Sequence, residues 1–382
     1  MRKLTESRGG PLAGLRVVEL AGIGPAPYAC LLLAELGADV VRVDRPGAVG
    51  AAVAASIGLA RSRSNIAVDL KSAQGRDVVL RLVRDADVLI EGLRPGVTER
   101  LGIGPADCHA INERLVYARM TGWGQSGPLA QTAGHDITYA AITGALHATG
   151  SVDKPRNAVN LVADFGGGSM FLLLGVLAAL QERQTSGRGQ VVDAAMVDGA
   201  ASLMTMVYGM FNRDGWIDAR ESNLLDGGTP YYDTYACADG KHVAVGAIEP
   251  QFFAELMKGL ELEFDQDDTA RWPEMRAAIA GRFTERTRDE WAAVFEQTDA
   301  CVAPVLSLAE APLHPHMAAR GVFATLDAGP EPRVAPVFSR TPADEPSSVR
   351  SAGEDTRSVL AAAGYAEHEI DDLIQAGFVR QA

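Results

Sequence analysis

The sequence has few cysteines, and they are scattered. Cys30, Cys108, Cys237 and Cys301 lie far apart, so the chain has no C-x-x-C motif of the kind that binds a metal or exchanges electrons. A chain without paired cysteines fits the reducing cytosol, where disulfides are rare. We therefore expect a cytoplasmic protein without a metal site.

The sequence also has no evident targeting or membrane signal. The first ten residues are polar and hold no apolar stretch of the signal-peptide kind, and residues 379–382 carry no obvious address signal. The longest apolar run, at 170–180, is shorter than a helix that crosses a bilayer requires. These features predict a protein that does not associate with a membrane.

Positive charge is scarce and dispersed. The 35 Lys and Arg residues are outnumbered by 49 Asp and Glu residues, the net charge is −14, and no basic run is longer than Arg61-Ser62-Arg63. This average field repels a polyanion, so we expect no nucleic-acid partner. An anionic small ligand remains compatible, because a few local arginines can bind phosphate groups.

The pattern of the first half indicates an α/β domain. The 382 residues are 47% hydrophobic and 22% charged, which fits a globular chain of two domains or one large domain with an insertion. Short strand patterns alternate with helix-length segments, as in a doubly wound parallel sheet. The predicted strands are 15–20, 38–43, 66–70, 87–90 and 115–120, with helices at 28–36 and 74–85.

The second half begins with long helices and then changes character. Asp164 stands where the N-cap of a helix belongs, and Asp239-Gly240 separates two alternating segments in the manner of a β-hairpin. The predicted helices are 165–184, 194–212, 251–260, 272–283 and 288–297. We predict a large domain at 1–200, a linker helix at 201–224, a small α+β domain at 225–325 and a return to the large domain at 326–382.

The loop after the first predicted strand matches a dinucleotide fingerprint only in part. Gly22 and Gly24 fit the first two glycines of G-x-G-x-x-G, and Asp44 stands where a ribose-binding acid would. Pro27 replaces the third glycine, and Pro25 removes an N–H that could bind a pyrophosphate. We interpret the loop as a tight turn from strand to helix.

Three residues have the chemistry of acid/base catalysis. His135 follows a strand end and a Gly-rich loop, where open α/β sheets bind ligands, while Asp164 precedes a long helix and Glu249 lies between a strand and a helix. Each also has an ordinary interpretation, as a hydrogen-bonded histidine, an N-cap and a solvated acid. A His and a carboxylate could remove a proton from the carbon beside a carbonyl and return one on the opposite face.

Three glycines follow Asp164, at 166–168, and weaken the predicted helix. They are expected where a ligand approaches the backbone closely at the start of a helix. A developing enolate oxygen at that point would also be stabilised by the positive end of the helix dipole.

Motifs spread over residues 11–340 resemble those of α-methylacyl-CoA racemases and follow the same order. Among them are LRVVELAGIGPAP, VVRVDRPG, AGHDITY, NLVADFGGGSMF and AVGAIEPQFF. These enzymes belong to the family III CoA-transferase (CaiB–BaiF) superfamily. The resemblance implies a racemase of 2-methylacyl-CoA thioesters that needs no cofactor. It also implies an interlocked homodimer in which each subunit has a Rossmann-like large domain and a smaller domain.

The resemblance assigns the site residues as well. His135 and Asp164 become the two acid/base groups, and Glu249 pairs with His135, across the dimer if the subunits interlock. The implied CoA site consists of Arg45 for a nucleotide phosphate; Val68, Asp69, Leu70 and Lys71 for the adenosine; Gly92, Leu93, Arg94 and Arg100 for the diphosphate; and Gly134, Asp136, Ile137, Thr138 and Tyr139 for the thioester end.

Three other functions remain open. A CoA-transferase of the same superfamily would use Asp164 as a nucleophile that forms a mixed anhydride, although such transferases generally lack the histidine of the G-H-D motif. An NAD-linked oxidoreductase is disfavoured by Pro27. A non-catalytic acyl-CoA binding protein is disfavoured by the presence of His135, Asp164 and Glu249 together.

Overall fold

Internal contacts divide the chain into two units. The computed structural model describes residues 9–47 and 58–382. The large unit holds the described residues up to Thr143, together with Ala158–Leu203 and Gly321–Ala382. The small unit holds Gly144–Asn157 and Met204–Arg320. The chain therefore leaves the large unit twice and returns to it twice.

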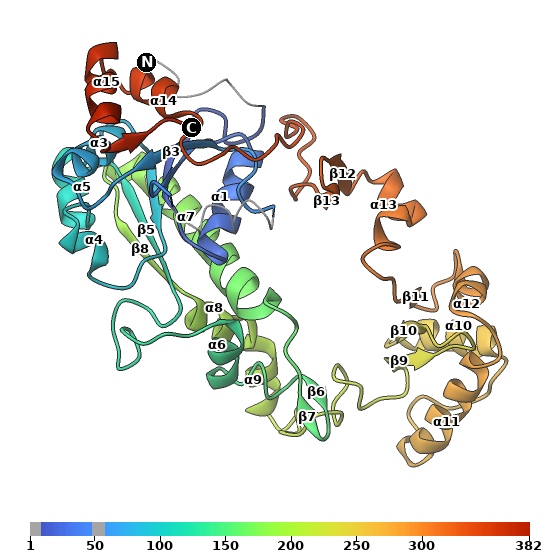
Figure 1. Ribbon diagram of the computed structural model, residues 1–382. Coiled ribbons are helices and arrows are strands. Elements are labelled where there is room, and N and C mark those ends of the chain that lie inside the picture. Colours follow the sequence, from blue (N-terminus) through green and yellow to red (C-terminus); the bar gives the residue numbers. More distant parts are fainter. Residues whose placement is uncertain (1–8, 48–57) are drawn as a thin grey trace. The chain divides into compact units, whose positions relative to one another are not determined.

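A seven-stranded sheet forms the centre of the large unit (Figure 1), in the order β14-β3-β2-β1-β4-β5-β8. All pairs except β14–β3 are parallel, and the strand order reverses between β1 and β4. The predicted α/β class with a mostly parallel sheet is confirmed. The strands are β1 (Arg16–Leu20), β2 (Asp39–Asp44), β3 (Ser64–Val68), β4 (Val88–Glu91), β5 (Val116–Thr121), β8 (Val191–Ala195) and β14 (Val379–Arg380).

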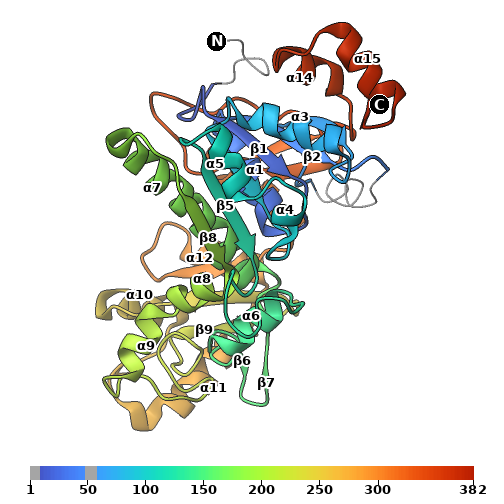
Figure 2. The same cartoon turned by 90° about the vertical axis from the view of Figure 1, so that its left-hand side faces the viewer.

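Helices cover both faces of this sheet (Figures 1 and 2). Buried side chains of α3, α14 and α15 share one core with the strands, which are rich in buried Val, Ile and Leu as parallel strands are. The helices of the large unit are α1 (Pro25–Glu35), α3 (Ala73–Val83), α4 (Val97–Arg100), α5 (Pro105–Ile111), α6 (Asp136–Ile142), η1 (Leu161–Met170), α7 (Phe171–Ser186), α8 (Met196–Leu203), α14 (Thr356–Ala362) and α15 (Glu367–Gln375). A hairpin of β12 (Phe323–Leu326) and β13 (Gly329–Pro332) precedes α14.

Two strands that the sequence pattern did not predict complete the sheet. β8 spans the start of the segment predicted as one helix at 194–212, which continues as α8 and α9 (Thr205–Phe211). The first three positions of β8 are not buried, so it lacks the apolar run of the other strands. β14 has only two residues and pairs antiparallel, with Val379 opposite Val68.

The helix predicted at 165–184 starts earlier and is longer. It consists of the π-helix η1 followed by α7, and together they span 26 residues. By length and composition alone this helix could cross a membrane, which corrects the estimate made from the apolar run at 170–180. It contacts β5, β8 and α8, as a helix that covers a sheet does.

The small unit contains a three-stranded antiparallel sheet in the order β11-β10-β9. β9 and β10 form the predicted hairpin, with Val243 opposite Tyr235. Phe283 and Trp291 lie in the core of the small unit. The elements are β6 (Gly150–Ser151), β7 (Lys154–Pro155), α9, β9 (Tyr232–Ala236), β10 (His242–Gly246), α10 (Pro250–Leu260), η2 (Thr269–Arg271), α11 (Trp272–Phe283), α12 (Arg288–Phe295), β11 (Val302–Pro304), η3 (Ala311–Leu313) and α13 (Pro315–Ala319).

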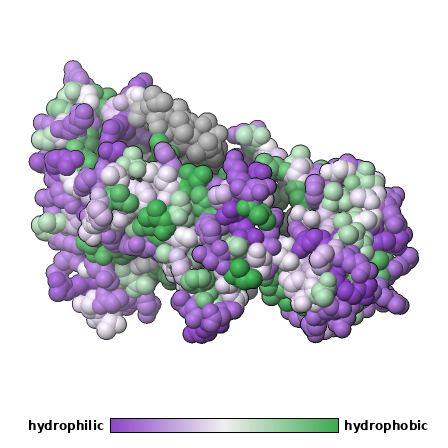
Figure 3. All heavy atoms as spheres, turned by 90° about the horizontal axis from the view of Figure 1, so that it is seen from below, coloured by the Kyte–Doolittle hydropathy of each residue, from purple (hydrophilic) through white to green (hydrophobic). Residues whose placement is uncertain are grey.

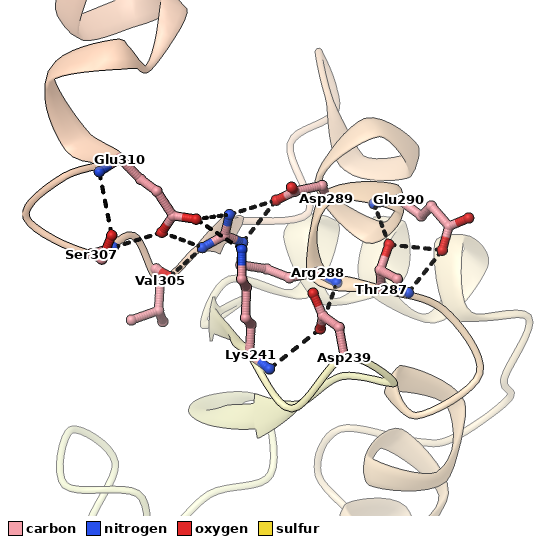
Figure 4. Close-up of polar contacts among 9 residues, drawn as sticks. All are labelled: Asp239, Lys241, Thr287, Arg288, Asp289, Glu290, Val305, Ser307 and Glu310. Atoms are coloured by element: carbon pink, nitrogen blue, oxygen red, sulfur yellow. Dashed lines mark hydrogen bonds and ion pairs between the residues drawn. The ribbon is translucent and has the colours of Figure 1, made fainter.

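A cluster around Arg288 fastens the segment after β11 to α12 (Figure 4). Arg288 is 3% exposed, and its guanidinium donates to the carbonyl of Val305 at 2.9 Å and to both carboxylate oxygens of Glu310 at 2.9 and 3.0 Å. Lys241 Nζ and the backbone N–H of Ser307 also donate to Glu310, at 2.8 and 2.9 Å. These donors hold the pKa of the Glu310 carboxyl well below its usual range, Arg288 having the largest effect.

Candidate active site

A cavity of about 500 Å³ opens at the carboxyl ends of the parallel strands in the large unit. Its walls include the loops after β1, β4 and β5, among them Gly24, Gly92 and Trp123. The strand order reverses between β1 and β4, and open α/β sheets bind ligands at such a switch point. His135 and Asp164 both line this cavity, so the structure brings together two of the three predicted catalytic residues.

The backbone of His135 is fixed by the first turn of α6. Its N–H donates to Thr138 Oγ1 at 2.9 Å, and the same hydroxyl donates to the carbonyl of His135 at 2.7 Å. The preceding Gly134 is required by packing, because a Cβ there would come within 2.5 Å of the Tyr139 ring. The histidine side chain itself is exposed at the cavity.

Asp164 is not the N-cap of its helix, which corrects the prediction. It lies inside the π-helix η1, whose N-cap position is Asn160. The capping acceptor is a different acid, Asp136, whose Oδ1 accepts the N–H groups of Ala163 and Asp164 at 2.9 and 2.7 Å. The Asp164 side chain is thereby left to line the cavity. π-Helical turns are rare and are often found at functional sites.

The three glycines after Asp164 serve helix packing. A Cβ at position 167 would lie 2.5 Å from the backbone nitrogen of Ala200 in α8, and one at position 168 would lie 2.9 Å from Met196 Cγ. The carbonyl of Gly167 would in turn lie 1.9 Å from a Cβ at position 199. The glycines therefore allow η1 and α8 to approach closely, where the sequence suggested close approach of a ligand.

The electrostatics of Asp164 suit proton transfer. Burial, together with the nearby Asp136 carboxylate, raises the pKa of Asp164 to about 6, against opposing effects of a hydrogen bond from Asn160 and of His135. An acid/base group works best when its pKa lies near the operating pH. The raised pKa thus gives Asp164 access to both protonation states near neutrality.

Two aromatic rings form part of the cavity wall. Trp123 and Tyr139 meet edge to face, with centroids 4.7 Å apart and an interplanar angle of 83°. Burial and the charge of Asp164 raise the pKa of the Tyr139 phenol. Tyr139 was predicted from its motif, whereas Trp123 was not.

The structure divides the predicted CoA-binding residues. Gly92, Leu93, Arg94, Gly134 and Tyr139 line the cavity. The side chains of Val68 and Leu70 lie in the sheet core, so they could reach a ligand only through their backbone. The others predicted for this role but not among the lining residues are Arg45, Asp69, Lys71, Arg100, Asp136, Ile137 and Thr138.

A buried ion-pair network fixes the loop that carries Arg94. Glu91, at the end of β4, accepts the N–H of Leu93 at 2.6 Å and Arg119 Nε at 2.9 Å. Arg119 also reaches Glu99 in α4 at 2.8 Å. This network was not predicted, because strand ends and a short helix bring together residues that are distant in sequence.

Glu249 belongs to the small unit. It is the N-cap residue of α10 and adopts an extended backbone, with φ −73° and ψ 141°. Its predicted pairing with His135 stays a prediction.

Several lining residues were missed, and they lie at or just after strand ends, or in or just after the Gly-rich loop. The signal that could have found them is the switch-point rule applied to each predicted strand end. They are Ile23, Gly24, Pro25, Pro95, Met120, Thr121, Gly122, Trp123, Ala130, Thr132, Ala133 and Met196.

The model of CoA-transferase family III matches residues 12–356. The chain belongs to this family. Two similar relatives are the α-methylacyl-CoA racemases of Mus musculus and Homo sapiens, which are 47% and 43% identical to it, each over 95% of the chain and 96% of the relative. A crystal structure of a CaiB/BaiF family protein from Brucella suis, 25% identical, superposes with a TM-score of 0.81 over 93% of this chain and all of that one. Membership of the family and the resemblance to racemases are therefore confirmed.

Proposed function

We propose that this protein is a racemase that interconverts the two epimers of 2-methylacyl-CoA thioesters. The observation that carries the proposal is the position of His135 and Asp164 on one cavity at the switch point, with the pKa of Asp164 raised to about 6. The proposal is supported by identities of 47% and 43% to α-methylacyl-CoA racemases over nearly the whole chain.

The mechanism is a transfer of one proton off and one proton onto the α-carbon. His135 removes the α-proton of one epimer, and the electron pair of the broken C–H bond moves into the thioester to form an enolate. Protonated Asp164 then delivers its proton to the opposite face of the same carbon, which leaves His135 protonated and Asp164 ionised. The other epimer uses the same groups in reverse order.

The CoA portion of the substrate would extend from this cavity. We propose that Arg94, on the loop fixed by Glu91, contacts the diphosphate, and that Gly134 and Tyr139 contact the thioester end. Arg45 and Arg100 are exposed and would contact phosphate groups, while residues 68–71 would flank the adenosine through their backbone. Local arginines would thus bind an anionic ligand despite the net charge of −14.

We further propose a homodimer, interlocked as the resemblance implies, in which Glu249 of one subunit meets His135 of the other. Its support is apolar surface on the large unit: Leu161, Leu174 and Leu177, on η1 and α7, are 59%, 63% and 42% exposed. Figure 3 shows hydrophobic side chains gathered in patches among hydrophilic ones on the face that it draws. Apolar patches of this kind mark contact surfaces.

The proposed reaction needs neither a metal ion nor a redox cofactor, because the thioester itself stabilises the carbanion and the substrate carries CoA. We propose a cytoplasmic location, which rests on the scattered cysteines. Branched fatty acyl, sterol side-chain and aryl-propionyl thioesters are all compatible substrates, and the first two would place the enzyme in lipid metabolism.

The alternative is a CoA-transferase in which Asp164 attacks the thioester and forms a mixed anhydride. The family model is named for that activity. The position of His135 beside Asp164 on the cavity favours proton transfer, because a nucleophilic carboxylate has no need of a second acid/base group.

The deciding experiment is incubation of one epimer of a 2-methylacyl-CoA with the protein in D₂O. We expect one deuterium at the α-carbon by mass spectrometry and convergence to both epimers by chiral analysis, both lost in His135→Ala and Asp164→Ala. Transfer of CoA to an added carboxylate without deuterium uptake would instead identify the transferase.

A further inference from the structure

Asp136 connects the two acid/base groups through the backbone. It is the first residue of α6, directly after His135, and the residue is 5% exposed. Its Oδ1 accepts two N–H groups from the first turn of η1, those of Ala163 and Asp164. One residue is therefore tied covalently to the histidine and by hydrogen bonds to the peptide that carries the aspartate.

The first N–H groups of a helix have no partner within the helix. Leu161 and Phe165 donate to backbone carbonyls, of Ala158 and Asn160. Asp136 supplies the acceptor for two of the N–H groups between them, and it does so from a different element. Without this acceptor, two buried or partly buried donors would be left unpaired, and the turn would have to shift to find water.

We propose that Asp136 is a positioning residue of the proposed racemase, in which its carboxylate holds the turn of η1 that carries Asp164 in place relative to His135. The proposal rests on the proposed function, since both groups are assigned roles there. Asp136 acts through the η1 backbone and through its charge, whereas the proton is carried by the other two residues.

The charge part follows from the groups that face Asp164. Burial raises the pKa of Asp164 most. Among the described residues, Asp136 raises it further, while the Asn160 amide and His135 lower it. Tyr139 has its own pKa raised by burial and by Asp164. An Asn at position 136 would keep an oxygen for both N–H groups and remove the charge. An Ala there would remove both the acceptor oxygen and the charge.

The test measures deuterium exchange at the α-carbon with Asp136→Asn and Asp136→Ala in the full chain, from pH 5 to pH 9. We expect Asp136→Ala to lower kcat by about 10²-fold, because a misplacement of about 1 Å can cost that much, with a smaller effect on KM. We expect Asp136→Asn to keep most of kcat at its own optimum. With the epimer whose α-proton Asp164 removes, the acid limb of the pH profile should move to lower pH, because Asp164 is harder to protonate without the neighbouring charge.

The matched control is Asp107→Ala. Asp107 Oδ2 also accepts a backbone N–H at a helix start in the same unit, that of Gly104 at 3.0 Å, but Asp107 does not line the cavity. This control should lose some stability and keep the wild-type kcat and pH profile, so it separates capping in general from positioning.

Two results would overturn the inference. One is Asp136→Ala with the kcat and pH profile of the wild type. The other is Asp136→Asn whose acid limb is unshifted with the epimer that Asp164 deprotonates, or whose activity is as low as that of Asp136→Ala. If Asp136→Ala does not fold, as judged by circular dichroism, the Asn variant alone decides. Failure of the wild-type protein to exchange the α-proton would refute the proposed function, and the inference with it.

Discussion

Asp164 in the large unit and Glu310 in the small unit are carboxylates in opposite surroundings. Asp164 is partly buried, lies near another carboxylate and has its pKa raised to about 6. Glu310 receives hydrogen bonds from Arg288, Lys241 and Ser307, and its pKa is lowered. The arrangement around Asp164 costs folding free energy at neutral pH and yields a group that can carry a proton. The arrangement around Glu310 stabilises the fold and keeps that carboxylate ionised, so it does not transfer protons near neutral pH.

The strongest test of this contrast is to replace each carboxylate by its amide. Asp164→Asn should lower the exchange rate by roughly 10²–10⁴-fold, because the amide can neither donate nor accept the transferred proton. Glu310→Gln should leave kcat unchanged. Steady-state exchange kinetics measure both, and losses of similar size in the two variants would contradict the division of roles.

Packing provides a second contrast between the units. Gly167→Ala should destabilise the large unit by about 2–3 kcal/mol, since the new Cβ meets the α8 backbone at 2.5 Å. Gly281→Ala in α11 has no neighbour within 4 Å of the added Cβ and should stabilise by about 0.5–1 kcal/mol. Denaturant unfolding measures both changes, and effects of the same sign would refute this account of the glycines.

The ion pairs of Arg288 should contribute more to the stability of the small unit than the exposed pair of Arg271 with Glu274. Arg288→Ala should lower the Tm by several degrees, because it leaves a partly buried carbonyl and Glu310 without their main donor. Arg271→Ala removes a pair with Glu274 whose two side chains are 46% and 62% exposed, and it should change little. Scanning calorimetry compares the two, and an equal effect would mean that burial does not matter here.

The pH dependence of stability should have opposite signs for the two carboxylates. The pKa of Asp164 is raised from 3.8 to about 6, so its ionisation costs stability as pH rises through 6. Asp164→Asn should therefore be more stable than the wild type above pH 6, by about 1–2 kcal/mol, and equal to it below the unfolded pKa.

Glu310→Gln should behave in the reverse way. Because the folded pKa is lowered, the stabilisation is fully present above the unfolded value of 4.5 and is lost as pH falls toward the folded value. The variant should be less stable than the wild type at pH 7, with a difference that shrinks in acid. Thermal unfolding at several pH values measures both curves, and parallel curves for the two amides would contradict the comparison.

The parallel sheet and two catalytic residues of its cavity could be predicted from the sequence, because apolar strand runs and strand ends are local signals. β1 to β5 were predicted this way, and His135 and Asp164 were found from the residues after strand ends and before a helix. β8 and β14 were missed, since their pairing depends on partners distant in sequence, with Val191 opposite Tyr117 and Val379 opposite Val68.

The roles around Asp164 show the limit of local patterns most clearly. An Asp before an apolar helix looks like an N-cap, and glycines beside it look like a ligand site. The acceptor that caps η1 comes from Asp136, 28 residues before Asp164, and the glycines meet α8. Neither contact is encoded in the spacing of the residues that it involves.

The pairing of β14 with β3 has a consequence for the order of folding. Gly353 donates to the Asn65 side chain across 288 residues of chain, and β14 follows it. Loop closure over such a distance is slow, and domains of a growing chain fold as their residues emerge. Every described residue that lines the cavity precedes position 197, yet the sheet beneath it is completed only by residues synthesised after the whole small unit. A ribosome-bound chain will thus carry His135, Asp164 and the strands that position them before β14 closes the edge of the sheet.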